Sequence, residues 1–195
     1  METREIAESA PMSAWFSAAT PYPDTSVSLW RNNPHLPRRL ACGVTFDIVL
    51  AGRSLIESAY RLLARYEQPL GPAVTFTNIR SAAVLVPRGT SARWPGLMTA
   101  AQWPGRVSQP ACLGRGHAIL IPALAPRPTA GLVRWLVPPD DEQTIGGVPL
   151  LTSPVPLARC LTEAHAALAP RTRERTPLSR AVSAVRPVLP SPQRT

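Results

Sequence analysis

Asp47, an aspartate inside an apolar segment, is the first residue that could take part in catalysis or bind a metal. Asp47 lies in residues 43–50, GVTFDIVL, where β-branched and aromatic residues predict a β-strand. A carboxylate there could ligate Mg²⁺, which prefers oxygen ligands. Side chains two apart on a strand share a face, so a second ligand would be expected at position 49, which is Val49. We therefore favour a structural role in which Asp47 accepts backbone hydrogen bonds.

The glycine pair of residues 114–117, GRGH, is the second stretch with chemical potential. It lacks the rest of a dinucleotide-binding fingerprint, and two glycines can form a tight turn without any ligand. Arg115 and His117 could contact a phosphate, although a lone His at a strand start is more often simply half-exposed. Cys112 and His117 could form a nucleophile and its base, but the sequence offers no third group to orient them.

The other Cys and His residues form no metal or redox motif. No Cys-x-x-Cys pair is present, and three cysteines argue against a secreted disulfide framework. His35 and His165 have no partner at metal-ligand spacing, and His165 is expected to face outward from a helix. We predict buried free thiols, no metal site and a reducing, cytoplasmic location.

Charge and composition limit the classes of partner. All 21 basic residues are Arg, the usage typical of a GC-rich genome, and the net charge of +9 permits contact with nucleic acid. No apolar run approaches the ~20 residues of a membrane helix, so no membrane partner is expected. Trp94, Trp103 and Trp135 could stack on bases, although core packing is favoured for them.

The elements that must position these residues follow from periodicity and turn residues. Ser54 and Glu57 have the spacing of a capping box that starts a helix, and residues 20–41 are expected to be a connection. Strands are predicted at 43–50, 73–77, 82–87, 117–121 and 132–137. Helices are predicted at 11–19, opened by Pro11, and at 54–66, 96–103 and 154–168. Leu157, Cys160, Leu161, Ala164 and Leu168 form the apolar stripe of the last helix.

These elements predict one α/β (α+β) domain over residues 1–169, with a mixed or mainly antiparallel sheet packed by helices. Strands 73–77 and 82–87 are expected to form a hairpin, and this hairpin, strand 43–50 and strand 117–121 are expected in one continuous sheet. Residues 170–195 differ, because they hold six Arg, one Glu and five Pro and few large apolar groups. They are predicted to be a disordered basic tail.

Several segments resemble, in order, the N-terminal domain of the bifunctional DNA primase/polymerase family, of archaeal-eukaryotic primase type. Residues 114–122 and 131–139, GRGHAILIP and GLVRWLVPP, resemble the glycine pair, apolar strand and Trp-bearing strand that close its catalytic sheet. Residues 15–19, 41–49, 70–74 and 84–90 resemble its first helix, its acidic-motif strand and its middle hairpin. The resemblance spans roughly residues 12–168 and is greatest to short, stand-alone members.

The resemblance implies phosphoryl transfer by two metal ions, magnesium or manganese, held by carboxylates. Members with the full pattern carry two acids on the first strand, a His on the hairpin and an Asp before the glycine pair. This chain has Val49 for the second acid, Asn78 and Arg80 near the place of the His, and Gln109 near that of the last Asp. Only Asp47 remains, which implies a degenerate active site.

The expected function is thus a primase/polymerase-like domain associated with nucleic acid, with weak and non-specific binding of single-stranded DNA or RNA. Two alternatives stay open: an active template-dependent nucleotidyltransferase whose acids lie elsewhere, which would need magnesium or manganese, and a non-catalytic protein-interaction module. The candidate nucleic-acid contacts are Arg80, Arg115, His117, Arg134, Arg171, Arg173 and Arg175.

Overall fold

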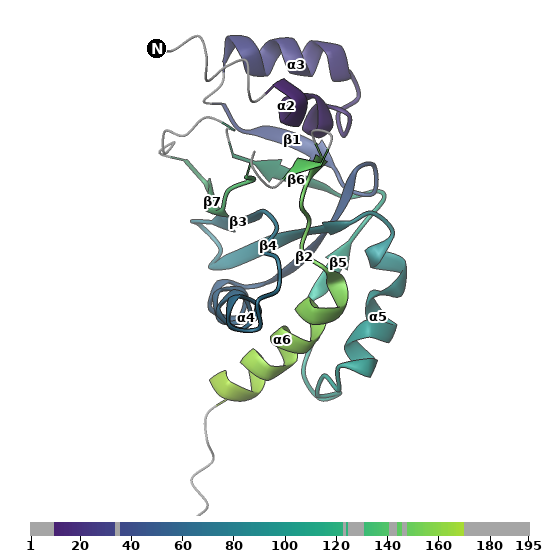
Figure 1. Cartoon of the computed structure of the whole chain (residues 1–195), viewed down its shortest axis with the longest axis vertical. Helices are drawn as coiled ribbons and strands as arrows, with labels where there is room; N and C mark the ends of the chain where they lie inside the picture. Colours follow the sequence, from purple (N-terminus) through teal and green to yellow (C-terminus); the bar gives the residue numbers. More distant parts are fainter. Residues whose placement is uncertain are drawn as a thin grey trace, which may run out of the picture.

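A computed structural model describes residues 10–33, 36–122, 124, 131–140, 144–145 and 148–169. It confirms the predicted fold class, because helices pack on an antiparallel sheet of five strands in the order β5-β2-β4-β3-β7 (Figure 1). The strands are β2 (Phe46–Gly52), β3 (Ala73–Phe76), β4 (Ser81–Pro87), β5 (Ala111–Leu113) and β7 (Val133–Val137). The longest pairing joins β2 to β4, from Phe46 opposite Pro87 to Gly52 opposite Ser81.

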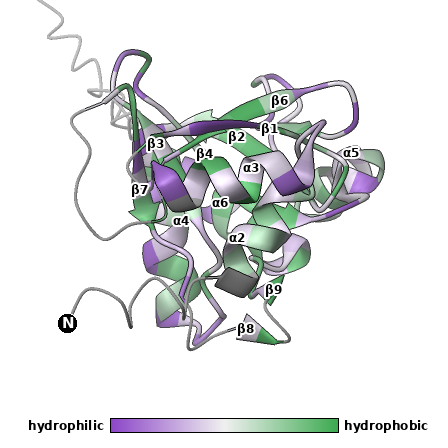
Figure 2. Cartoon of the chain, turned by 90° about the horizontal axis from the view of Figure 1, so that it is seen from above, coloured by the Kyte–Doolittle hydropathy of each residue, from purple (hydrophilic) through white to green (hydrophobic). Residues whose placement is uncertain are grey.

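Alternation along the strands divides the buried side chains between two faces of the sheet. Val49, Val84 and Val86 face a layer formed by the helices α4 (Arg53–Arg65), α5 (Thr90–Ala100) and α6 (Pro154–Leu168). Phe46 and Ile48 face the opposite way, toward α2 (Ala10–Ser17), α3 (Pro23–Asn32) and a two-stranded ribbon of β1 (Arg38–Ala41) and β6 (Ala118–Ile121). Figure 2 looks down onto this second layer. Both faces of the sheet are therefore covered.

The predicted position of β6 is wrong. We expected strands 43–50 and 117–121 in one sheet, but among the described strands β6 pairs only with β1, with Leu40 opposite Ile119 and Ala41 opposite Ala118. The short strand β5, absent from the prediction, takes the edge beside β2. After the Gly114–Gly116 turn, β6 passes over the sheet, where Ile119 and Ile121 are buried in the second core. A three-residue strand is too short to show a period, which explains the error.

Two further predictions are wrong, one for the segment 20–41 and one for the start of the helix predicted at 96–103. Residues 20–41 are not a mere connection, because they contain α3 and β1; Pro23 at the start of α3 and Asp24 in its first turn are ordinary helix-start signals. The helix predicted around 96–103 begins earlier, at Thr90, after Gly89 in a left-handed conformation (φ 84°). Its start was missed because Pro95 and Gly96 suggest a boundary, whereas both lie inside α5.

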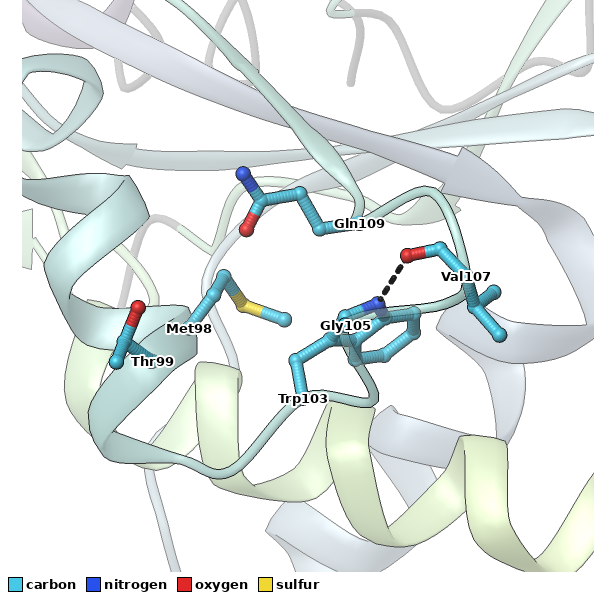
Figure 3. Close-up of a pocket in the computed structure, with 6 residues that line it drawn as sticks. All are labelled: Met98, Thr99, Trp103, Gly105, Val107 and Gln109. Carbon is cyan, nitrogen blue, oxygen red and sulfur yellow. Dashed lines mark hydrogen bonds between the residues drawn. The ribbon is translucent and has the colours of Figure 1, made fainter.

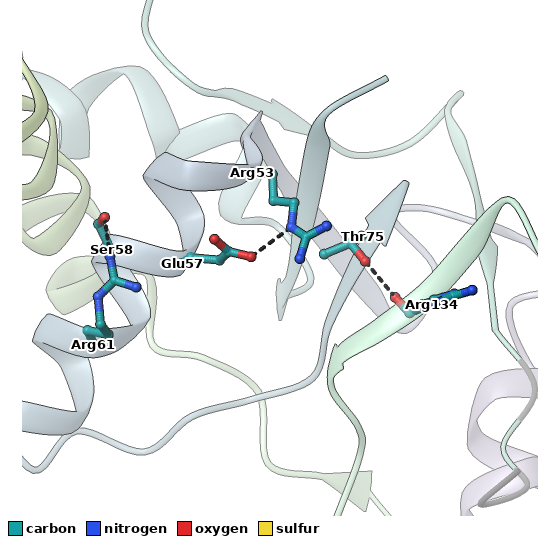
Figure 4. Close-up of polar contacts among 6 residues, drawn as sticks. All are labelled: Arg53, Glu57, Ser58, Arg61, Thr75 and Arg134. Atoms are coloured by element: carbon teal, nitrogen blue, oxygen red, sulfur yellow. Dashed lines mark hydrogen bonds and ion pairs between the residues drawn. The ribbon is translucent and has the colours of Figure 1, made fainter. Parts of the chain in front are cut away.

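Helices α4 and α6 both contribute buried side chains to the core on one face of the sheet, and they also pack against each other. The capping box does not form, however: Gly52 is the N-cap of α4 without a side-chain hydrogen bond, and Glu57 instead pairs with Arg53 at 2.7 Å (Figure 4). In α6 the first four residues of the predicted stripe are buried, but Leu168 is 49% exposed because the helix ends there. Two short strands, β8 (Thr144–Ile145) and β9 (Val148–Pro149), precede α6.

Candidate functional site

Asp47 is buried at the junction of β2 and α5. Its side chain is 1% exposed, and Oδ2 accepts the backbone N–H of Ser91 at 2.7 Å. The helix has no side-chain cap of its own, because its N-cap residue is Gly89. The hydroxyl of its first residue, Thr90, donates to the Pro87 carbonyl at 2.5 Å. The first backbone N–H groups of a helix need acceptors, and a negative charge there is stabilised by the helix dipole. Asp47 therefore acts as a cap that reaches α5 from the neighbouring strand.

The surroundings of Asp47 are closely packed and poor in oxygen ligands. A Cβ placed on Gly114 would lie 3.3 Å from Asp47 Oδ1 and 2.2 Å from Ser91 Oγ, so only glycine fits there without a shift. Burial, with a smaller contribution from the Asp47 charge, raises the pKa of Cys42 to about 11. The same two causes, with a further contribution from Cys42, raise the pKa of Cys112 to about 12. Both thiols are thus neutral near pH 7.

The positions that the family resemblance would group around two metals are not brought together. Val49 shares the Asp47 face but is fully buried under the helical layer. The 77–80 turn lies beyond the far end of β2, where Arg53 donates its backbone N–H to the Arg80 carbonyl, and Gln109 lines a hollow with Gly52. From Asp47 to Gly52 the strand runs roughly 16 Å at about 3.3 Å per residue, whereas paired metals lie about 4 Å apart.

No candidate metal centre is found within the described part of the chain. It contains no group of three or more His, Cys, Asp or Glu side chains that could hold an ion. Asp47 has two thiols near it, Cys42 and Cys112, but no second carboxylate or imidazole from the described residues, and its Oδ2 is already hydrogen-bonded to α5. The Asp47 side chain therefore joins β2 to α5 and has a structural role.

The predicted nucleic-acid contacts fall into two groups at opposite ends of β2. Arg115 and His117 are exposed in the turn between β5 and β6, and Arg88 lies beside them, donating to the Val44 carbonyl at 3.3 Å. This turn packs against Gly43 (φ 80°), where a Cβ would lie 2.5 Å from the Arg115 backbone nitrogen. We call Arg88, Arg115 and His117 the turn group.

Arg80 and Arg134 form the second group, which we call the hairpin group. Arg80 is exposed in the 77–80 turn at φ 40°, and Arg134 is exposed on the edge strand β7, opposite Thr75 (Figure 4). Within the described residues no acidic side chain pairs with either guanidinium. Arg171, Arg173 and Arg175 lie outside the described residues, as does His35.

The three tryptophans divide between core and surface. Trp94 is buried and donates its indole N–H to the Pro110 carbonyl at 2.8 Å, and Trp135 packs beside Phe16 with ring centroids 6.3 Å apart. Trp103 is half-buried and stacks on His165 at 4.6 Å, so His165 does not face outward as predicted. A loop residue and a helix residue 62 positions away share no sequence period, so the sequence gave no signal for this contact.

A hollow beside Trp103 is the other feature that sequence reasoning missed. Met98, Thr99, Gly105, Val107 and Gln109 complete its lining (Figure 3). The sequence suggests for Gln109 only the place of a lost acid of the metal site. In the structure its neighbours in this hollow come from α5 and from the segment between α5 and β5.

Comparison of the chain with known protein families, with curated proteins and with solved structures finds no match. Among the described residues, no helix has the length and apolar character needed to cross a membrane.

Proposed function

We propose that this chain is a non-catalytic, primase/polymerase-like domain that associates with single-stranded nucleic acid. The observation that carries the non-catalytic part is the Asp47–Ser91 hydrogen bond. The one acid left from the metal motif is buried, and it is used to cap α5. A carboxylate that serves a helix terminus inside a closed core is not available to clamp a triphosphate-bound metal.

The binding part of the proposal is supported by charge and exposure. The net charge is +9, and the turn group and the hairpin group put exposed guanidinium groups at both ends of the central sheet. Arginine contacts phosphates through several fixed donors, and such contacts carry no base preference. Weak and sequence-independent binding of a single strand is the expected behaviour.

A primer-extension assay tests the catalytic half. The protein is given a primed template, all four nucleotides and either Mg²⁺ or Mn²⁺, with an active polymerase as the positive control. We expect no product above background. Metal-dependent extension that is lost in Asp47→Ala, with the variant still folded, would overturn the proposal and favour the active nucleotidyltransferase.

Fluorescence anisotropy with a labelled single strand tests the binding half. Arg115→Ala and Arg134→Ala each remove one exposed guanidinium from the two groups, and Arg65→Ala, in the last turn of α4, is the matched control. We expect the first two to weaken binding and to make the log–log salt slope shallower by about 0.7 per phosphate contact. If no binding is detected at low salt, the protein-interaction alternative takes the place of this proposal.

A further inference from the structure

Two adjoining hollows lie between the end of α5, the segment leading into β5 and helix α6. Their volumes are about 290 Å³ and about 440 Å³, and Trp103, Val107 and Gln109 line both of them. They are therefore two parts of one groove, which we call the Trp103 groove. Small-molecule sites typically enclose about 300–1,000 Å³. The two hollows have volumes of this order but are open to solvent, so a ligand of a few rings would be only partly enclosed.

Trp103 forms a wall of the groove that is held in place before any ligand arrives. Its indole N–H donates to the Val107 carbonyl at 3.1 Å, and its ring stacks on His165 at an interplanar angle of 36°. Met98 borders the groove from α5 but is fully buried beneath it (Figure 3). A fixed aromatic ring suits a flat ring as its occupant, and little ordering entropy remains to be lost on binding.

Gln109 supplies the polar component of the groove. Figure 3 shows its side chain extending across the hollow from the strand side, with the amide away from Trp103. The side chain is exposed and makes no hydrogen bond to any described residue, which leaves one donor and one acceptor for a ligand. A glutamine amide can form two hydrogen bonds with the N6 and N7 edge of adenine.

Arg106 places a positive charge next to the groove, although it is not itself one of the lining residues. It lies between Gly105 and Val107, both of which line the groove, and it is exposed without an acidic partner among the described residues. Aromatic wall, amide and guanidinium together match a base that carries a phosphate. Neither the turn group nor the hairpin group contains a residue of this groove.

From these contacts we infer that the Trp103 groove binds an adenine nucleotide, with the base against Trp103, its edge at Gln109 and its phosphate toward Arg106. The ligand can be one base of a bound nucleic-acid strand, and in that case the inference deepens the proposed function and rests on it. A free mononucleotide has the same chemistry. The two sources are separated by the experiment.

Isothermal titration calorimetry of the full chain with AMP is the first arm. We expect saturable binding that is tighter for AMP than for GMP, which presents two acceptors at the same edge, and tighter than for CMP. Gln109→Ala should weaken AMP binding about tenfold or more. Gln102→Asn, at a neighbouring exposed position outside the groove, is the matched control and should bind like the wild type.

Further variants separate stacking from folding. Trp103→Ala removes packing against α6 and can unfold the chain, so Trp103→Leu and His165→Ala are measured beside it, with circular dichroism as the check on the fold. Arg106→Ala should weaken AMP binding but not adenosine binding, whereas Arg93→Ala, exposed on α5, should change neither. AMP affinity that Gln109→Ala and Trp103→Leu leave unchanged in folded protein would overturn the assignment.

An oligo(dA) strand is the second arm, compared with oligo(dC) of the same length. If AMP and oligo(dA) both lose affinity in Gln109→Ala, the groove accepts either source. If AMP binds and no strand does, the groove stands and the proposed nucleic-acid function fails. If strands bind equally well in wild type and Gln109→Ala, and AMP does not bind at all, the proposed function stands and the groove assignment fails.

Discussion

Asp47 on β2 accepts the backbone N–H of Ser91 on α5 at 2.7 Å, and the residue that follows β5, Gly114, packs against both. The contact ties a strand, a helix and a turn that are far apart in sequence. This carboxylate has a structural task in the folded state: Oδ2 is used by the contact to α5, and Oδ1 is buried without a hydrogen-bond partner among the described residues. The consequences of this junction can be measured.

Removing the Asp47 carboxylate should destabilise the fold without changing any chemistry. Asp47→Ala deletes the acceptor of the Ser91 N–H, and the loss of a helix cap costs about 0.5–2 kcal/mol. Asp47→Asn keeps a carbonyl oxygen and should lose less. Urea unfolding of the three proteins checks the order, and equal stability of wild type and Asp47→Ala would show that the hydrogen bond contributes nothing.

A methyl group at position 114 should destabilise the same junction. Gly114→Ala would bring its Cβ within 2.2 Å of Ser91 Oγ and 3.0 Å of Ser91 Cβ, and such overpacking typically costs about 1–3 kcal/mol. Gly96→Ala is the matched control, because its Cβ would meet nothing within 4 Å inside α5. Replacing a glycine in a helix by alanine should stabilise by about 0.5–1 kcal/mol. Melting temperatures that move in the same direction for both variants would contradict this.

Residues with a strong local period were the predictable part of the fold. Leu63, Val84 and Leu161 belong to elements whose apolar spacing marks a face, and each is buried where the pattern put it. The sequence could not show that β5, and not β6, forms the edge of the sheet. The position of β6 depends on the burial of side chains such as Ile119 and Ile121 in the second core. This position is decided by tertiary packing, which a local pattern does not contain.

At the candidate site, the sequence could predict the role of a side chain but not its partner. Asp47 was correctly favoured as an acceptor of backbone hydrogen bonds, but its partner Ser91 lies 44 residues away and has no sequence signature. Gln109 and His165 lie far apart in the sequence, and no spacing or motif links them. Only the packing of α6 against the segment after α5 brings them to the same groove.

Both thiols near Asp47 should be protected and should make the fold sensitive to alkaline pH. Burial raises the pKa of Cys42 from 9.0 to about 11 and that of Cys112 from 9.0 to about 12. Above pH 9 the unfolded chain loses these protons while the folded protein keeps them, so stability falls as the pH rises from about 9 toward 11. A disulfide reagent at pH 8 should react with both thiols much more slowly in folded than in denatured protein. Cys42→Ala with Cys112→Ala should flatten the alkaline decline, and an unchanged decline would assign it to other groups.

A buried hydroxyl pair holds α4 to the segment before β3 and to the segment before α6. The Tyr60 hydroxyl donates to the Gly71 carbonyl at 2.9 Å and lies 3.1 Å from Thr152 Oγ1, which accepts the Gly71 N–H at 2.9 Å. Tyr60→Phe leaves the Gly71 carbonyl without its donor in a buried place, which should cost about 1–3 kcal/mol. Tyr66→Phe is the control, since the exposed Tyr66 hydroxyl donates to Glu163 and its loss should stay within about 0.5 kcal/mol. Chemical denaturation that gives equal losses would contradict the difference.

The basic segment of residues 170–195, which lies outside the described residues, should account for much of the salt dependence of strand binding. If all six of its arginines met one phosphate each, the log–log salt slope would approach about −4, at roughly −0.7 per contact on a single strand. The measured slope should be shallower, because not every side chain of the segment engages at once. Replacing Arg171, Arg173 and Arg175 by Ala in the full chain should remove up to about 2 of that slope. The same titration of Arg115→Ala and Arg134→Ala reports the share of the folded domain. A triple variant that binds with the wild-type affinity and slope would assign the phosphate contacts to the turn group and the hairpin group instead.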